Sequence, residues 1–564
     1  MKFSEYKYER VNLDYIKEEY DKATKTIKES KDLDSVCCAI TNINNLKKDF
    51  ETSMTLCSVR YSINTMDEFY AKEQEFNDEV GPIIEGYNNE FNKALVNSPL
   101  IDKLKERYGK KIFDEIILSL KTFSEEIIPL LQEENKLCSA YSKLIASAKI
   151  PFDGKVLNLS QLAPYLESSD REVRRQVEMV LGDYTKENEE KFDDLYDKLV
   201  HIRDEMAKKL GFENAIDFSY ARLGRLDYDS KMVANYRKQI YEELVPLVSK
   251  MYEDQRKRLG LDKLMNYDLS YEFESGNPMP IGTPEELVKK ASKMYHMMSK
   301  ETGEFFDFMQ SHELMDLVAK EGKTSGGYCT FIFNYDSPFI FSNFNGTSSD
   351  IDVLTHEAGH AFQFYSSRHT ELIENMFPTL EACEIHSMSM EFFAWPWMEL
   401  FFGDQTKKRL FSHMAGTITF IPYGASVDEF QHEIYQNPNM TKEERKECWR
   451  RIEKKYCPWK VYTHPTLEKG TRWYRQGHIF SSPFYYIDYT LAQVCAQQFW
   501  IKDQENHENA WHDYYKLCCL GGTKTFLDLI KEANLMNPFI DGTIHFVTEK
   551  LSAFLDSIDS EKIK

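Results

Sequence analysis

The segment Thr355-His356-Glu357-Ala358-Gly359-His360 decides how this chain is interpreted, because it places two imidazoles four residues apart with a carboxylate directly after the first. In an α-helix, four residues turn the backbone by roughly 400°, so both rings lie on one face and can reach a single metal ion. This is the spacing of a helical zinc site, in which Glu357 is an unligated carboxylate beside the two rings. The segment therefore predicts a catalytic zinc site.

The residues around this segment are mostly apolar, among them Leu354, Ala358, Ala361 and Phe362. A helix with so many apolar residues belongs in a core, where imidazole and carboxylate groups need partners. The alternatives are a chance match on an exposed helix and a set of satisfied core residues. Because the chain has only 14 His in 564 residues, we favour the metal site over both.

A catalytic zinc site needs a third protein ligand, and the next predicted helix offers three carboxylates. This helix begins near Thr379 and carries Glu381, Glu384 and Glu391. Glu384 and Glu391 lie two turns apart on the same face, whereas Glu381 lies one turn before Glu384. The residues alone leave open which of the three is the ligand.

At this point the sequence resembles the thimet oligopeptidase and oligoendopeptidase F family of zinc metallopeptidases. Its members carry His-Glu-x-Gly-His followed, about two dozen residues later, by Glu-x-x-Ser-x-x-x-Glu, which here runs from Glu384 to Glu391. The resemblance implies that His356, His360 and Glu384 hold one Zn²⁺ per chain and that Glu357 is the general base. Glu391 would support the ligands from behind or be an ordinary charge on the helix.

Upstream of the zinc helix, two short segments extend the resemblance. Gly322 to Thr330 is similar to the family's glycine turn, and Phe339 to Phe344 has the aromatic and β-branched composition of a strand. The resemblance implies an edge strand that pairs with an extended peptide, with Phe341, Ser342 and Asn343 as substrate-binding residues. An ordinary buried strand is the alternative, because edge position cannot be read from the sequence.

Downstream, the segment from Arg472 to Tyr489 is similar to the His and Tyr cluster that faces the zinc in this family. The resemblance implies that His478, Tyr486 and Tyr489 are catalytic and donate hydrogen bonds to the oxyanion of the reaction. Tyr485 would bind substrate or take the place of Tyr486. Core packing is the alternative explanation for a Tyr-rich run.

The composition is that of a large globular enzyme. With 42% hydrophobic and 14% aromatic residues, the chain can bury an extensive core. Its formal charge of −22 argues against nucleic acid as a partner. No run of 18 apolar residues and no hydrophobic segment near Met1 is present, so we expect a cytoplasmic protein that does not bind membranes. The 11 Cys are scattered without a C-x-x-C motif, which indicates reduced thiols.

The hydrophobic pattern predicts helices along most of the chain. Leu13, Ile16, Tyr20, Ala23 and Ile27 recur at the spacing of an amphipathic helix. The same pattern returns over residues 112–145, 172–210 and 230–259, and residues 150–159 read as a small hairpin around Asp153-Gly154.

The predicted fold is therefore mostly α, with a small β-sheet beside the zinc helix. The resemblance implies two helical halves around a deep substrate channel, the build of a gluzincin-type peptidase. We expect residues 1–200 to form an N-terminal helical region of the channel wall and residues 201–564 to form the catalytic helical domain, with a soft boundary.

The expected function is that of a zinc metalloendopeptidase that hydrolyses internal bonds of short unfolded peptides, as a monomer or a small homo-oligomer. A zinc carboxypeptidase of similar helical build is the first alternative. A non-catalytic peptide-binding protein is the second, although such a protein has no need of the base Glu357. A helical scaffold does not explain three polar ligands in apolar helices.

Overall fold

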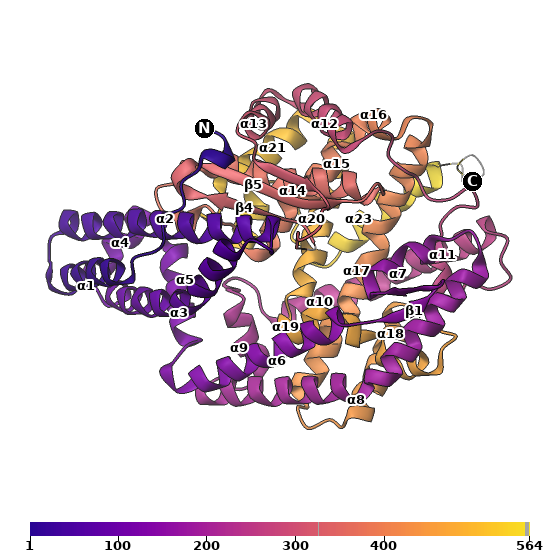
Figure 1. Ribbon diagram of the computed structural model, residues 1–564, viewed down its shortest axis with the longest axis horizontal. Coiled ribbons are helices and arrows are strands. Elements are labelled where there is room, and N and C mark those ends of the chain that lie inside the picture. Colours follow the sequence, from indigo (N-terminus) through magenta and orange to yellow (C-terminus); the bar gives the residue numbers. More distant parts are fainter. Residues whose placement is uncertain (325, 559–562, 564) are drawn as a thin grey trace. The chain divides into compact units, whose positions relative to one another are not determined.

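Helices carry most of the chain, so the predicted mostly α fold is confirmed (Figure 1). This computed structural model describes residues 1–324, 326–558 and 563. Contacts divide the chain into two units, each built from three separate segments of sequence. The predicted boundary near residue 200 falls inside one continuous helix, α8 (Arg171–Lys209).

The first unit comprises residues 1–120, 279–404 and 496–535. Its helices and strands are α1 (Leu13–Glu29), α2 (Leu33–Ile63), α3 (Glu68–Val96), α4 (Ile101–Tyr108), α5 (Lys110–Lys121), α12 (Pro284–Met298), α13 (Lys300–Ser311), β3 (Met315–Val318), β4 (Tyr328–Ile332), β5 (Ser337–Phe344), α14 (Ser349–Ser367), α15 (Leu380–Phe393), α16 (Glu399–Phe402), α21 (His507–Leu520) and α22 (Phe526–Glu532).

The second unit comprises residues 121–278, 405–495 and those from Met536 onward. It contains, besides α8, the elements α6 (Ile128–Ala146), β1 (Ile150–Phe152), β2 (Lys155–Leu157), α7 (Leu159–Leu162), α9 (Ala215–Arg222), α10 (Ser230–Gln239), α11 (Val245–Arg258), α17 (Thr406–Gln436), α18 (Lys442–Tyr456), α19 (Gly477–Ser481) and α23 (Thr543–Ser557). Helix α20 (Tyr486–Glu505) begins in this unit and ends in the first.

The predicted hairpin is present as the antiparallel pair β1–β2. Its two turn residues, Asp153 and Gly154, both have positive φ angles, as a tight two-residue hairpin turn requires. The first predicted helix is also present, and the apolar face of α1 is buried as its spacing indicated.

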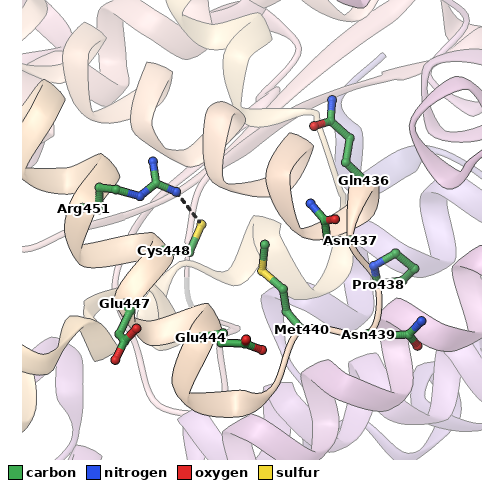
Figure 2. Close-up of a pocket in the computed structure, with 9 residues that line it drawn as sticks. All are labelled: Gln436, Asn437, Pro438, Asn439, Met440, Glu444, Glu447, Cys448 and Arg451. Atoms are coloured by element: carbon green, nitrogen blue, oxygen red, sulfur yellow. Dashed lines mark hydrogen bonds between the residues drawn. The ribbon is translucent and has the colours of Figure 1, made fainter.

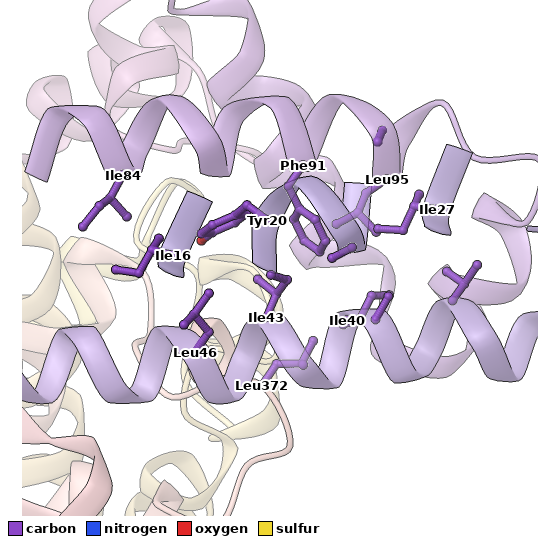
Figure 3. Packing of buried hydrophobic residues seen from close by; sticks show 14 of the residues in the cluster. Ile16, Tyr20, Ile27, Ile40, Ile43, Leu46, Ile84, Phe91, Leu95 and Leu372 are labelled. Atoms are coloured by element: carbon purple, nitrogen blue, oxygen red, sulfur yellow. The ribbon is translucent and has the colours of Figure 1, made fainter. Parts of the chain in front are cut away.

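Helices α1, α2 and α3 share one hydrophobic core, which Figure 3 shows. One member of this core, Leu372, comes from the connection between α14 and α15. Asn44 of α2 fixes the same connection through hydrogen bonds to the carbonyl of Glu371 and the amide of Ile373, at 3.0 and 2.9 Å. The N-terminal helices therefore fold together with the connection that links the two helices of the predicted zinc site.

The sheet of the first unit has the strand order β3-β5-β4, with β5 parallel to β3 and antiparallel to β4. The predicted strand over Phe339 to Phe344 is therefore confirmed, but its predicted position at an edge is wrong. Strand β5 is central, and seven of its eight residues are buried. Because β5 pairs with β3 on one side and with β4 on the other, the two edges of the sheet are β3 and β4.

Helix α14 packs against α15, β4, β5 and α21, and α14 and β5 are seen together in Figure 1. Its contact with α15 is unusually close at Gly359. A β-carbon at this position would lie 2.6 Å from Cα of Ser387 and 2.8 Å from the carbonyl oxygen of His386. Only a residue without a side chain allows the two backbones to approach this far.

We predict that Gly359→Ala lowers the melting temperature, because the added methyl group forces α14 and α15 apart. Overpacking of this kind costs about 1–3 kcal/mol. Gly86→Ala is the matched control, since Gly86 lies in α3 with open space around it and alanine is the better helix former. Thermal unfolding of both variants checks this. Equal melting temperatures for Gly359→Ala and the unchanged protein would contradict the close contact.

Candidate metal and catalytic site

Helices α14 and α15 bring three predicted ligands together. The imidazoles of His356 and His360 and the carboxylate of Glu384 offer one atom each, and these atoms all lie within 4.8 Å of one another. Oε2 of Glu384 is 3.2 Å from Nε2 of His356 and 3.7 Å from Nε2 of His360. Of the three carboxylates on α15 that the sequence left open, Glu384 is the one that meets both rings.

The group is electrostatically asymmetric. Burial lowers the pKa of His360 to about 4, which keeps its imidazole neutral. Burial opposes ionisation of Glu384, but its contacts with His356 and His360 hold its pKa at about 2. A neutral imidazole and an ionised carboxylate are the forms that bind a divalent cation.

A second carboxylate fixes the orientation of His356. Nδ1 of His356 lies 2.7 Å from Oε1 of Glu391, and an ionised carboxylate only accepts hydrogen bonds. Nδ1 therefore carries a proton. Burial opposes the charged form of His356, but its contacts with Glu384 and Glu391 raise its pKa, so Nε2 must lose a second proton before it can bind a metal. Ser387 donates to Oε2 of Glu384 at 3.1 Å. Both contacts orient ligand atoms from behind, as outer residues of metal sites do.

Glu357 lies beside this group without belonging to it. Burial raises the pKa of its carboxyl group to about 7, and the nearby carboxylates of Glu384 and Glu391 add to the increase. A carboxyl group with a pKa near neutrality can both accept and release a proton at physiological pH. Its Oε1 is 3.6 Å from the point where a β-carbon on Gly327 would lie, so Glu357 faces the start of β4.

The predicted substrate residues Phe341, Ser342 and Asn343 hold the glycine turn instead of presenting a free edge. The Asn343 amide donates to the carbonyls of Thr324 and Gly326, both at 2.8 Å. Phe341 pairs with residues of β3 and β4. The backbone groups of this strand are therefore used within the protein, and the predicted backbone pairing of β5 with a peptide is not available at Phe341.

Strand β4 provides the edge that β5 does not. Residues 328–330 line a hollow of about 460 Å³ together with residues of α2 and α3. The turn before β4 is anchored by the buried ammonium group of Lys323, which donates to the carboxylate of Asp316 and the carbonyl of Ser342. Within this predicted turn, Ser325 lies outside the described residues.

The predicted His and Tyr residues form a cluster in the second unit. The His478 ring on α19 lies 5.9, 5.0 and 5.6 Å from the rings of Tyr485, Tyr486 and Tyr489, centroid to centroid. All four side chains are half-buried. Their common location is what the resemblance implied, and their approach to the His356–His360–Glu384 group stays a prediction.

A strained residue orients the start of α20. Phe484 is buried and has a φ angle of 64°, which is costly for a residue with a side chain. Two buried side chains hold it. The amide group of Phe484 donates to Gln431 at 3.0 Å, and its carbonyl accepts from Arg225 at 2.7 Å. Arg225 also donates to Asp488 of α20 at 2.6 Å.

A surface hollow of about 890 Å³ lies where α17 ends and α18 begins (Figure 2). Arg451 donates to the sulfur of Cys448 there, at 3.7 Å. None of the residues that line the hollow is a predicted site residue, so it has no part in the candidate site. Among the described helices, none has both the length and the apolar composition needed to cross a membrane.

The supporting residues of these sites were missed from the sequence. Arg225 and Gln431 act through contacts with Phe484, which lies 259 and 53 residues away in the chain. Lys323 contacts Asp316 and Ser342, which are nearer in sequence but lie on the strands β3 and β5. Gln476 was also missed, although it lies only two residues before His478, to which it is hydrogen bonded.

Comparison with known proteins agrees with this geometry. Residues 3–123 match the family model described as Peptidase M3 N-terminal domain, and residues 164–545 match the model described as Peptidase family M3. An oligoendopeptidase F homolog from Borreliella burgdorferi is 24% identical over 478 residues, which are 79% of this chain and 77% of that protein.

Two solved structures are similar over the full length. One, described as PZ peptidase A with inhibitor 2, is 51% identical, with a TM-score of 0.93 over 99% of this chain and 100% of that one. The other, a Bacillus anthracis str. Ames protein proposed to be an oligoendopeptidase F, is 47% identical, with a TM-score of 0.89 over 100% of this chain and 99% of that one. The resemblance seen in the sequence is thereby confirmed, and this chain belongs to peptidase family M3.

Proposed function

We propose that this peptidase is a zinc metalloendopeptidase that hydrolyses internal bonds of short, unfolded peptides. One observation carries the proposal. Three ligand atoms from two helices converge within 4.8 Å, while the neighbouring carboxyl group of Glu357 stays outside the group with a pKa raised to about 7. A binding-only site has no use for such a base.

The donor set fits zinc. Two imidazole nitrogens and one carboxylate oxygen, contributed by His356, His360 and Glu384, are a known ligand set for catalytic Zn²⁺. When bound, the ion supplies Lewis acidity, which lowers the pKa of a water molecule and polarises a carbonyl group. We propose one ion per chain.

Glu357 performs the proton transfers. Its carboxylate accepts the proton of the attacking water and then passes it to the leaving amine. Burial favours the first of these steps, because a carboxylate whose pKa is raised to about 7 is a stronger base. The side chain also faces Gly327 at the start of β4, the edge along which we propose that the substrate lies.

Strand β4 is the proposed docking edge for the peptide backbone. It ends the sheet β3-β5-β4, and an extended peptide can pair with an edge strand irrespective of its side chains. Backbone pairing of this kind accepts many sequences and requires an unfolded substrate. Such a requirement supports short peptides as the substrate class.

His478, Tyr486 and Tyr489 are the proposed donors to the oxyanion, with Tyr485 in contact with the substrate. Burial raises the pKa of Tyr486 and lowers that of His478, so the phenol keeps its proton and the imidazole stays neutral. Neutral donors stabilise a developing negative charge.

A peptide blocked at both ends, with a fluorophore and a quencher on either side of the cut, separates this proposal from a zinc carboxypeptidase. An endopeptidase cuts it and a carboxypeptidase does not. Mass spectrometry of the products then locates the bond. Retention of the intact peptide together with loss of single residues from unblocked peptides would favour the carboxypeptidase.

Glu357→Gln is expected to lower kcat by on the order of 10²- to 10⁴-fold while zinc remains bound, because the change removes the base and no ligand. Glu381→Gln on α15 is the matched control, since Glu381 is also buried but lies outside the ligand group. Rates are measured beside metal content. An active Glu357→Gln enzyme would refute the assigned role of this residue.

Glu384→Ala is expected to lose zinc, whereas Glu381→Ala is expected to keep it, because only Glu384 meets both imidazoles. Glu391→Ala should weaken zinc binding by about 10- to 100-fold, as a residue that orients a ligand does. Metal analysis after dialysis checks all three variants. A chelator should abolish turnover by the unchanged enzyme, and added zinc should restore it. Full zinc occupancy in Glu384→Ala would rule out this ligand set.

Tyr489→Phe and Tyr486→Phe test the oxyanion donors. Removal of the hydroxyl that contacts the oxyanion is expected to reduce kcat by roughly 10²-fold, with little change in KM or zinc content. Tyr474→Phe is the control, because its hydroxyl donates to Asp193 at 2.6 Å inside the second unit and its loss should lower the melting temperature instead. Normal kcat in Tyr485→Phe, Tyr486→Phe and Tyr489→Phe would remove this cluster from the active site.

A further inference from the structure

A short hydrogen-bond chain ends at His478. The Tyr423 hydroxyl donates to Oε1 of Gln476 at 2.8 Å. Nε2 of the same amide lies 2.8 Å from Nδ1 of His478. All three residues belong to the second unit, with Tyr423 on α17 and His478 on α19.

The chemistry of the amide determines which ring nitrogen carries the proton. An amide nitrogen donates hydrogen bonds and does not accept them, so Nδ1 of His478 is the acceptor. A neutral imidazole has one proton, which must then be on Nε2. Nε2 is thereby left as a donor.

The orientation of the Gln476 amide is itself set by Tyr423. Burial raises the pKa of Tyr423 to about 12, so the hydroxyl keeps its proton and must place it on an acceptor. The guanidinium groups of Arg472 and Arg475, which interact electrostatically with this hydroxyl, only donate. The Glu453 carboxylate also acts on it, but its two oxygens accept from Tyr462 and Arg450. The Tyr423 hydroxyl therefore donates to the amide oxygen of Gln476, and the amide nitrogen of Gln476 consequently points to His478.

The surroundings of His478 favour its neutral form. The rings of Tyr485, Tyr486 and Tyr489 lie against it, and Arg472 and Arg475 belong to its own segment. The neighbouring helices α6 and α20 also carry the buried carboxylates Glu134 and Asp488. Each of these carboxylates is paired with an arginine, Glu134 with Arg203 and Asp488 with Arg225, and burial lowers the pKa of His478. The ring therefore depends on its tautomer to be a donor.

We propose that Gln476, held by Tyr423, is a positioning residue that fixes His478 as the neutral tautomer with its proton on Nε2. This inference rests on the proposed function of His478 as an oxyanion donor. With the opposite tautomer, Nε2 would present a lone pair to a developing negative charge and repel it.

The tautomer is measured directly in the unchanged protein. Full-length enzyme labelled with ¹⁵N-histidine and loaded with zinc is examined by NMR at pH 8, and the His478 signals are assigned by their loss in His478→Ala. Correlation of each ring nitrogen with the ring protons identifies the protonated nitrogen. We expect the proton on Nε2. A proton on Nδ1 would overturn the proposal whatever the enzyme's activity.

Gln476→Glu tests the consequence for turnover. A carboxylate accepts from Nδ1, so neutral His478 would have no proton on Nε2, whereas its protonated form would still donate. The ratio of variant to wild-type kcat should therefore fall by roughly 10²-fold as rising pH deprotonates His478. The NMR titration should show a raised pKa for His478 in the variant. Gln436→Glu adds the same charge at an exposed position of the second unit and should give a flat ratio.

Tyr423→Phe provides a second, milder variant. It leaves Gln476 in place, but the Gln476 amide group can then rotate and exchange its oxygen and nitrogen positions. Signals of both tautomers are expected, with a smaller loss of kcat than in Gln476→Glu. A single Nε2–H tautomer in this variant would contradict the role of Tyr423. Normal kcat in His478→Ala would instead refute the proposed role of His478 in catalysis, and the tautomer would still be read from the spectrum of the unchanged protein.

Discussion

The close approach of two backbones at Gly359 is the constraint on which the candidate site depends. His356 and His360 come from one helix and Glu384 from another, so the ligand atoms converge only if the helices are nearly in contact. A β-carbon at position 359 would lie 2.6 Å from α15. The glycine between Glu357 and His360 is thus part of the site's geometry, although it presents no group to a metal. Glu391 and Ser387 then orient the ligand atoms that this contact brings together.

Much of the site could be predicted because its information is local. Glu357 and the two histidines lie within five residues of one helix, and the spacing of Glu384 from Glu391 is also a helical spacing. The mostly α fold and the β1–β2 hairpin follow from periodicities that span few residues. The choice of Glu384 over Glu381 came from resemblance, and the positions of the side chains agree with it.

What the sequence did not reveal depends on contacts between distant segments. Strand β5 is central because β3 and β4 pair with its two sides, and nothing in its own residues distinguishes a central apolar strand from an edge strand. Phe484 adopts a left-handed backbone only because Gln431 and Arg225 hold it. One boundary near residue 200 was expected, whereas contacts between distant segments divide the chain into two units of three interleaved segments each.

Leu372 connects this interleaving to the order of synthesis. It completes the core of α1–α3 from a position about 250 residues after α5 ends. At roughly 5–20 residues per second, a ribosome needs on the order of 10–50 s to reach it. During that interval the core of α1–α3 lacks one of its buried members, and apolar surface that is exposed in a nascent chain can be bound by chaperones. The core of the N-terminal helices can be completed only after the segment between α14 and α15 has been made.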